Sequence, residues 1–249
     1  MSLQAVILAG GLGTRLRPMT HSIPKAMVPI CGRPFMEYQL EALCASGVDD
    51  VVLCVGYLGQ QIVDHFGDGR EFGLSIRYGF ERKQLLGTAG AIKNVEDLLN
   101  DSFFVVNGDT YSIIDFPGIM AHFLGSDRLG LMVVFRNADQ WDRSNVVVDG
   151  DTVRIYDKER KLPEMVHIDF GVAAFRREAF GQIPQGTVVD LSSVYQPLIR
   201  RRQLLAYETA QRFYEVGSLA GLHEFEALVQ LGIFELCLTG SRKKLGANT

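Results

Sequence analysis

The feature that most constrains this chain is an apolar segment that runs into a glycine-rich turn. Residues 4–10 read QAVILAG, a continuous apolar run, and the turn GGLG follows at 10–13. Glycine lets the backbone approach a ligand closely, and two cations, Arg15 and Lys25, come soon after the turn. The segment therefore predicts a strand whose carboxyl end opens into a polyphosphate-binding loop.

Strand-like and helix-like segments alternate along the rest of the chain, which predicts a parallel sheet covered by helices. Residues 145–158 read as a hairpin that turns at 149–151, and residues 167–180 read as a strand with a short turn of helix. The pattern predicts an α/β fold, a Rossmann-like three-layer sandwich with a mostly parallel central sheet. The other expected strands are 4–10, 48–57, 74–80, 103–109, 129–137 and 204–209, and the expected helices are 34–46, 59–67, 87–100, 188–201 and 219–231.

The second half of the chain reads as a smaller mixed lobe that closes over a crevice. Ligands of open parallel sheets gather at the carboxyl ends of the strands. The strand ends 9–11 and 107–109 and the loop 81–88 are therefore expected to face that crevice. The expected organisation is one domain over 1–238, with halves at about 1–128 and 129–238, followed by a polar, disordered tail at 239–249.

Composition and charge exclude several classes of protein. The 249 residues are 47% apolar and 22% charged, so one soluble unit can bury a large core. A net charge of −4 and a pI near 5.8 leave no basic surface for nucleic acid. No apolar run approaches the ~20 residues that span a bilayer, and the first residues, MSLQ, lack the basic start of a signal peptide. We expect a cytoplasmic protein with no nucleic-acid or membrane partner.

Cysteine and histidine spacing argues against a redox centre or a zinc site. Cys31, Cys44, Cys54 and Cys237 lie far apart and form no C-x-x-C pair. We expect them to be small buried hydrophobic residues. The histidines are scattered, without an H-x-x-x-H pair.

The glycine turn does not match the two best-known phosphate-binding patterns. A dinucleotide fingerprint needs a third glycine, which does not arrive after Gly13, and the P-loop pattern G-x-x-x-x-G-K-[ST] is absent. Arg15 suits bidentate phosphate binding, and Lys25 supplies a point charge. A tight turn with two solvated cations remains an alternative at this point.

A longer pattern removes that alternative. Residues 9–29, AGGLGTRLRPMTHSIPKAMVP, resemble the signature of the sugar-1-phosphate nucleotidyltransferases without a gap. The resemblance covers roughly residues 3–230 and implies a glycosyltransferase A-like fold. It continues through LGTAGAI (86–92), VVNGDT (105–110), YDK (156–158), IDFG (168–171) and FYEVGS (213–218).

The resemblance also implies a reaction and a set of site residues. In this family a phosphate oxygen of a sugar 1-phosphate attacks the α-phosphorus of a nucleoside triphosphate in line, and pyrophosphate leaves. Arg15, Lys25 and Asp109 would be catalytic, and Asp109 and Glu215 would hold Mg²⁺. The nucleotide would lie against Leu8, Ala9, Gly10, Gly11, Gly13, Thr14, Arg15, Lys25, Gln84, Gly87, Thr88, Asn107 and Gly108, and the sugar phosphate against Asp157, Lys158, Asp169 and Gly171.

The chain departs from the family pattern at several of these positions. Glu215 stands where many relatives have aspartate, and Asp169 stands where they often have asparagine. Asp157 replaces the glutamate before the family lysine, and residues 143–145 read RSN where relatives often have RYG. Gln84 carries both a donor and an acceptor, so it does not decide between uracil, thymine and guanine.

Two subfamilies are similar to different parts of the chain. The LGTAGAI block and the short single-domain length resemble heptose-1-phosphate guanylyltransferases, whereas residues 59–78 resemble N-acetylmuramic acid 1-phosphate uridylyltransferases. The first hypothesis is guanylyl transfer to a heptose or mannose-type 1-phosphate, with GTP and the sugar 1-phosphate as substrates. Uridylyl or thymidylyl transfer to a hexose or amino-sugar 1-phosphate is the alternative. A catalytically silent nucleotide-sugar-binding regulatory protein is a hypothesis of another class, and a homo-oligomer is left open.

Overall fold

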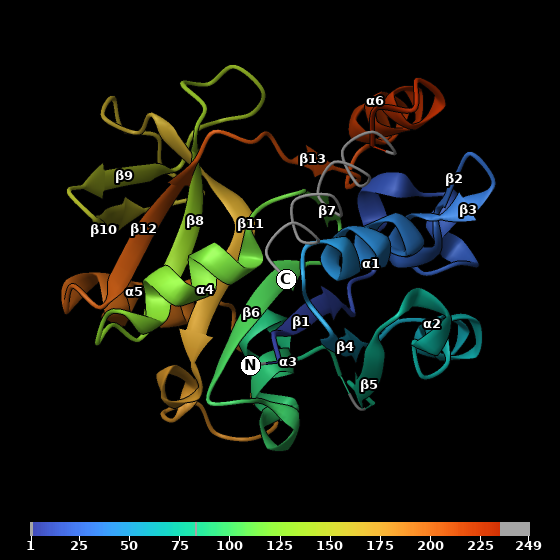
Figure 1. Cartoon of the computed structure of the whole chain (residues 1–249), viewed down its shortest axis with the longest axis horizontal. Helices are drawn as coiled ribbons and strands as arrows, with labels where there is room; N and C mark the ends of the chain where they lie inside the picture. Colours follow the sequence, from blue (N-terminus) through green and yellow to red (C-terminus); the bar gives the residue numbers. More distant parts are fainter. Residues whose placement is uncertain (1, 83, 235–249) are drawn as a thin grey trace, which may run out of the picture.

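The computed structural model describes residues 2–82 and 84–234. Its centre is a nine-stranded sheet in the order β5-β4-β1-β6-β11-β8-β12-β10-β9 (Figure 1). The strands of this sheet are β1 (Gln4–Ala9), β4 (Asp50–Val55), β5 (Ser75–Phe80), β6 (Ser102–Asn107), β8 (Gly130–Arg136), β9 (Val146–Asp149), β10 (Thr152–Tyr156), β11 (His167–Arg176) and β12 (Leu204–Thr209). Two short pairs accompany it, β2 (Pro29–Ile30) with β3 (Arg33–Pro34) and β7 (Thr110–Tyr111) with β13 (Tyr214–Glu215).

The N-terminal half of the sheet is parallel throughout. β1 lies between β4 and β6 and pairs in parallel with both, and β5 extends this arrangement beyond β4. Parallel neighbours need crossover connections, which helices supply here. The helices are α1 (Phe35–Ala45), α2 (Gly59–Phe66), α3 (Gly87–Asn94), α4 (Phe116–Leu124), α5 (Ser192–Arg200) and α6 (Leu219–Gln230).

The C-terminal half is mixed and continues the same sheet. β11 runs antiparallel between β6 and β8, whereas β12 is parallel to β8. The predicted hairpin is confirmed as β9 and β10, and Gly150 in its turn has a φ of 61°. The prediction of a mixed second half is therefore confirmed, but this half adds strands to the central sheet instead of forming a separate one.

Both faces of the sheet are buried, which gives the predicted three layers. Along β1, Ala5 and Ile7 belong to one apolar cluster and Val6 to the other, as alternation along a strand requires. Side chains of α1, α2 and α4 complete the first cluster, and side chains of α3 and α5 complete the second.

Helix α6 packs outside these layers, beside β2, β3 and the β7–β13 pair (Figure 1). Ser218 begins the helix, since its hydroxyl accepts a hydrogen bond from the Gly221 N–H. Phe225 packs edge-on against Phe35 of α1 and lies 4.9 Å, between ring centroids, from Tyr111 of β7. The helix therefore packs against the β7–β13 pair, which carries Glu215.

Several expectations need correction. The predicted helix 87–100 ends at Asn94 and continues as a 3₁₀ turn at Glu96–Leu98, and the predicted helix 188–201 begins only at Ser192. Helix α4 was not predicted. The predicted tail 239–249 lies outside the described residues. No helix within residues 2–82 and 84–234 is long and apolar enough to cross a membrane.

The cysteines divide by environment. Cys54 is buried in β4, and burial raises the pKa of its thiol. Cys31 is exposed, so the prediction that it is a buried hydrophobic residue is wrong. Its backbone has a φ of 48° in the turn between β2 and β3, where the side chain points outward. Cys237 lies outside the described residues.

Candidate active site

The glycine turn and the N-G-D segment meet at the carboxyl ends of two neighbouring strands. Leu8 of β1 pairs with Asn107 of β6, and the Gly108 N–H donates to the Leu8 carbonyl at 3.2 Å. A Cβ atom on Gly108 would overlap that carbonyl, so the close approach requires glycine. The predicted meeting of residues 9–11 with residues 107–109 is therefore observed.

The glycine turn folds back to place its two cations. Gly13 has a φ of 60°, and its carbonyl accepts hydrogen bonds from the Leu16 N–H at 3.0 Å and the Thr20 hydroxyl at 2.8 Å. A Cβ atom on Gly13 would lie 3.1 Å from that of Lys25. The turn therefore packs directly against the segment that carries Lys25.

Four charged side chains converge at this edge of the sheet. The Lys25 ammonium pairs with the Asp109 carboxylate. Nη2 of Arg15 donates to Oε1 of Glu215 at 2.7 Å and lies 3.9 Å from Oδ2 of Asp109. The side chains of Lys25 and Asp109 are 19% and 22% exposed, whereas that of Arg15 is 63% exposed, so the inner pair is the better shielded from water.

A two-residue ladder brings the carboxylates together although they are distant in the chain. Glu215 of β13 pairs with Thr110 of β7, and the Val216 N–H donates to the Asp109 carbonyl at 2.8 Å. A Cβ atom on Gly217 would overlap the Glu215 carboxylate and lie 2.6 Å from Nη2 of Arg15. The ladder and Gly217 together leave room for the Arg15–Glu215 pair.

This pair of carboxylates fits a magnesium site in its donor chemistry. One nitrogen of Arg15 lies 2.7 Å from Glu215 and 3.9 Å from Asp109, so both carboxylates face the same cationic group. Mg²⁺ prefers oxygen ligands and commonly takes one or two carboxylates with substrate phosphates. Within residues 2–82 and 84–234 no group of three or more His, Cys, Asp or Glu side chains could hold a metal ion, so the remaining ligands would come from substrate and water.

A cavity of about 210 Å³ adjoins the glycine turn, and the residue that reaches into it is Glu81 rather than Gln84. The Leu86 N–H donates to Oε1 of Glu81 at 2.7 Å, and Oε2 lies over Gly10, where a Cβ atom would overlap it. Burial raises the pKa of Glu81, and no cation among the described residues pairs with it. The cavity is lined by Leu8, Gly10, Gly11, Cys54, Glu81, Leu85, Gly87, Thr88, Ala91 and Asp190.

The loop beside this cavity is fixed by the segment before α5. Gly87 has a φ of 70°, and a Cβ atom there would lie 2.7 Å from the Val189 carbonyl oxygen. The Thr88 hydroxyl accepts the Leu191 N–H at 2.6 Å. Gly87 and Thr88 are thus held at the cavity, whereas Gln84, which was predicted to contact the base, is not among its lining residues.

The predicted sugar-phosphate residues surround a second cavity of about 570 Å³. Asp169 accepts hydrogen bonds from the Tyr156 hydroxyl at 3.1 Å and from the Gly171 N–H at 3.0 Å. Burial, with Asp169 nearby, raises the pKa of Tyr156, so the phenol stays protonated as the donor. Gly171 has a φ of 82°, and a Cβ atom there would lie 2.7 Å from the Thr110 hydroxyl.

Asp157 and Lys158 occupy the rim of this cavity in different roles. The Asp157 carboxylate accepts the N–H groups of Arg160 and Glu159, at 2.9 and 2.8 Å, and these bonds lower its pKa. It therefore holds the turn that presents Lys158. The Lys158 ammonium lies 5.7 Å from the centre of the Tyr156 ring and lines both this cavity and a larger one.

The larger cavity, of about 770 Å³, connects the four charged side chains with the C-terminal half of the chain. It contains Arg15, Asp109 and Glu215 on one side and Asn145 and Trp141 on the other. Asn107, Lys158, Asp169 and Gly171 line both this cavity and the second one. Thr88 and Asp190 line both the second and the smallest. The three cavities thus share walls along one crevice.

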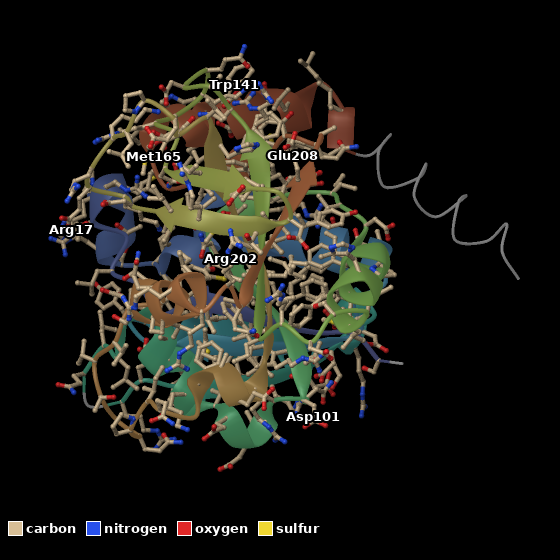
Figure 2. All side chains as sticks on the ribbon, turned by 90° about the vertical axis from the view of Figure 1, so that its left-hand side faces the viewer. Arg17, Asp101, Trp141, Met165, Arg202 and Glu208 are labelled. Carbon is tan, nitrogen blue, oxygen red and sulfur yellow. The ribbon has the colours of Figure 1, made fainter. Side chains whose placement is uncertain are left out.

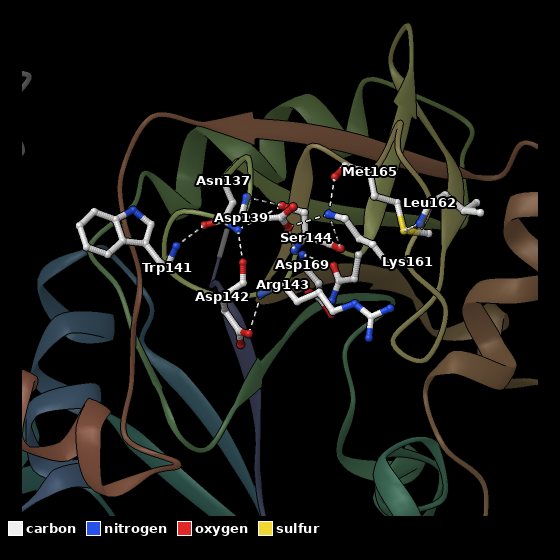
Figure 3. A network of polar contacts seen from close by, with 11 residues as sticks. Asn137, Asp139, Trp141, Asp142, Arg143, Ser144, Lys161, Leu162, Met165 and Asp169 are labelled. Carbon is white, nitrogen blue, oxygen red and sulfur yellow. Dashed lines mark hydrogen bonds and ion pairs between the residues drawn. The ribbon is translucent and has the colours of Figure 1, made fainter.

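Residues 143–145, which depart from the family pattern, include Asn145, whose side chain orders the chain at Asp169. Oδ1 of Asn145 accepts the Asp169 N–H at 2.9 Å, and the Asn145 N–H donates to the His167 carbonyl at 2.9 Å. The network of polar contacts in Figure 3 supports the loop formed by residues 137–145. In it, the Lys161 ammonium donates to the Asp139 carboxylate at 2.6 Å and to the Met165 carbonyl at 2.9 Å. No sequence signal pointed to Lys161.

The loop also reaches the segment that precedes Glu215. Trp141 points away from the polar network in Figure 3, and its ring lies 3.6 Å, from centroid to Cζ, below the Arg212 guanidinium. Arg212 in turn forms two hydrogen bonds with Glu224 of α6, at 2.8 and 3.0 Å. Trp141, which remains 58% exposed and is labelled at the surface in Figure 2, is thus anchored on one face.

The chain is similar to known proteins of one family. A model described as "Nucleotidyl transferase" matches residues 4–155. The chain is 33% identical to an N-acetylmuramate alpha-1-phosphate uridylyltransferase from Neisseria meningitidis serogroup B, covering 91% of this chain and 98% of that protein. It is 35% identical to a D-glycero-alpha-D-manno-heptose 1-phosphate guanylyltransferase from Campylobacter jejuni, covering 72% of this chain and 78% of that protein.

The solved structures agree in fold. HddC from Yersinia pseudotuberculosis, complexed with GMP-PN, matches with a TM-score of 0.74 and 26% identity over 89% of this chain and 97% of that one.

The chain spans about half the length of two further curated relatives. It covers 53% of a UTP--glucose-1-phosphate uridylyltransferase from Synechocystis and 55% of a mannose-1-phosphate guanylyltransferase from Mycobacterium tuberculosis.

Proposed function

The chain belongs to the nucleotidyl transferase family, and we propose that it transfers a guanylyl group from GTP to a heptose or mannose-type 1-phosphate. A phosphate oxygen of the sugar 1-phosphate attacks the α-phosphorus of GTP. The bond from that phosphorus to the bridging oxygen of the β-phosphate breaks, and pyrophosphate leaves. No covalent bond to the protein forms, so alignment and charge neutralisation are the protein's tasks.

The observation that best supports nucleotidyl transfer is the convergence of two cations with two carboxylates. Arg15, the most exposed of the four, is placed to bind the triphosphate with its planar fork. Lys25, shielded beside the glycine turn, would neutralise charge at the α-phosphate as the attacking oxygen approaches. Asp109 and Glu215 would hold Mg²⁺, which when bound supplies positive charge to the phosphate oxygens.

Glu81 favours guanine over uracil and thymine. An ionised carboxylate only accepts hydrogen bonds, and guanine offers it two adjacent donors, N1–H and the N2 amino group. Uracil and thymine offer one N–H between two carbonyl oxygens, which the carboxylate would repel. The half-buried position of Glu81, without a paired cation among the described residues, supports a role as acceptor for such donors.

Asp169 and Asn145 support a role in sugar binding. Asp169 lines both larger cavities, and its carboxylate is an acceptor for sugar hydroxyl groups. Oδ1 of Asn145 already accepts the Asp169 N–H, so its amide nitrogen is the atom that could donate to a hydroxyl group. Lys158, on the wall shared by these cavities, would bind the phosphate of the sugar.

A pyrophosphate-release assay tests this function. Purified protein with Mg²⁺ is offered GTP, UTP, dTTP and ATP, each with mannose, heptose, glucose and N-acetylamino-sugar 1-phosphates. We expect the fastest release with GTP and a heptose or mannose 1-phosphate. Faster release with UTP or dTTP would refute the guanylyl assignment. Binding of a nucleotide sugar without release from any pair would instead favour the catalytically silent alternative.

A further inference from the structure

The four charged groups of the site neutralise one another. The Lys25–Asp109 and Arg15–Glu215 pairs leave no net formal charge, and Arg15 also lies 3.9 Å from Asp109. These are the same groups that the proposed function assigns to two different ligands, the cations to phosphate and the carboxylates to Mg²⁺. Either ligand must therefore compete with a protein side chain.

We infer that the metal ion and the triphosphate each strengthen the binding of the other at this site, by an exchange of ion-pair partners. On binding, the two cations move from carboxylate to phosphate oxygens, and the two carboxylates move from the cations to the metal. The number of opposite-charge contacts is conserved when both ligands arrive. This inference rests on the proposed function, since it assumes that the site takes a nucleotide and a metal.

Each ligand alone leaves charges without partners. Phosphate alone would draw Arg15 and Lys25 away and leave two carboxylates beside an anion. Mg²⁺ alone would draw the carboxylates away and leave two cations beside it. The Lys25 and Asp109 side chains are mostly shielded from water, so solvent compensates them poorly.

The protein also offers too few ligands to hold Mg²⁺ firmly without the nucleotide. In the part of the chain that the structure describes, no cluster of three or more ligand side chains exists, and the carboxylates available are Asp109 and Glu215. Coupling between two ligands is reciprocal and commonly amounts to about 5- to 150-fold in affinity. We expect Mg²⁺ to strengthen GTP binding by at least about 10-fold, and GTP to strengthen Mg²⁺ binding equally.

Calorimetry on the full chain tests this exchange. Wild-type protein is titrated with GTP in EDTA, with GTP in saturating Mg²⁺, and with Mg²⁺ alone. The inference predicts weak binding of metal-free GTP, weak binding of Mg²⁺ alone and tight binding of the pair. Equal affinity for GTP with and without Mg²⁺, or tight binding of Mg²⁺ alone, would overturn it.

Two variants separate the exchange from simple repulsion between GTP and an acidic site. Glu215→Gln releases Arg15. Metal-free GTP should therefore bind this variant at least about 5-fold more tightly than it binds the wild-type protein. Arg15→Gln releases Glu215, so Mg²⁺ alone should bind more tightly. Asp142→Asn is the matched control. Asp142 lines the same cavity and carries the same charge, but pairs with no cation among residues 2–82 and 84–234.

The outcomes distinguish the exchange from the function on which it rests. An equal gain in metal-free GTP affinity for Glu215→Gln and Asp142→Asn would refute the exchange and leave the nucleotidyltransferase proposal intact. No binding of any nucleoside triphosphate to folded wild-type protein, with or without Mg²⁺, would refute the proposed function itself. Circular dichroism shows whether each variant folds. If a variant does not fold, the wild-type titrations alone test the exchange.

Discussion

At the scale of single residues, the proposed choice of base depends on the Glu81 carboxylate. Glu81→Gln replaces one acceptor oxygen with a donor but can still accept the Leu86 N–H. We expect the ratio of kcat/KM for GTP to that for UTP to fall about 10- to 100-fold, the cost of one buried hydrogen bond to a charged group. Gln84→Ala, outside the cavity, is the control and should leave this ratio unchanged.

The raised pKa of Glu81 gives the same residue a pH signature. Burial disfavours the charged form, so the carboxylate takes up a proton at a higher pH than an ordinary glutamate. Only the ionised form accepts both guanine donors. Affinity for GDP relative to UDP should therefore fall as the pH is lowered through this raised pKa. UDP corrects for the diphosphate, and in Glu81→Gln the ratio should not vary with pH.

At the level of elements, the close approach of the chain after β6 to the end of β1 predicts two opposite outcomes for glycine substitutions. A Cβ atom on Gly108 would overlap the Leu8 carbonyl, whereas one on Gly11 meets no atom within 4 Å. Gly108→Ala should cost about 1–3 kcal/mol of unfolding free energy through overpacking. Gly11→Ala should keep the stability but weaken GTP binding, because Gly11 lines the smallest cavity.

Thermal unfolding and nucleotide titration check both glycine variants. A loss of stability for Gly11→Ala equal to that for Gly108→Ala would show that the glycine turn is a packing feature only. Unchanged GTP affinity in a folded Gly11→Ala variant would remove the turn from the nucleotide site.

Periodicity predicted most of the elements but not all of them. Helix α6 and the β9–β10 hairpin were predicted closely, because the first has apolar residues at helical spacing and the second turns at Gly150. Helix α4 was missed. Asp115 caps its N-terminus, because its carboxylate accepts the Gly118 N–H, but Pro117 and Gly118 make its first turn resemble a loop.

The composition of the site was predictable, whereas its internal contacts were not. The N-terminal pattern led to Arg15 and Lys25, and N-G-D led to Asp109. Nothing in the sequence indicates that Arg15 pairs with Glu215, because that contact depends on the β7–β13 ladder. Nor does a loop sequence tell which of Glu81 and Gln84 points into the cavity, since that depends on the Leu86 N–H.

At the scale of the whole molecule, one continuous sheet holds both halves of the site. β6 leads into Asp109, and its antiparallel neighbour β11 carries Asp169 and Gly171. The wall shared by the two larger cavities includes Asn107 of β6 and Asp169 of β11. Paired strands do not slide, so the two substrates would meet in a fixed relative orientation, as in-line attack requires.

³¹P NMR follows directly whether the site formed by Arg15, Lys25, Asp109 and Glu215 joins a guanylyl group to a sugar phosphate. With GTP, Mg²⁺ and mannose or heptose 1-phosphate, we expect equal amounts of a diphosphate-linked nucleotide sugar and pyrophosphate. Asp109→Asn, folded as judged by thermal unfolding, should form neither, whereas Asp142→Asn should form both. Orthophosphate in place of pyrophosphate, or undiminished turnover in Asp109→Asn, would rule out guanylyl transfer at this site.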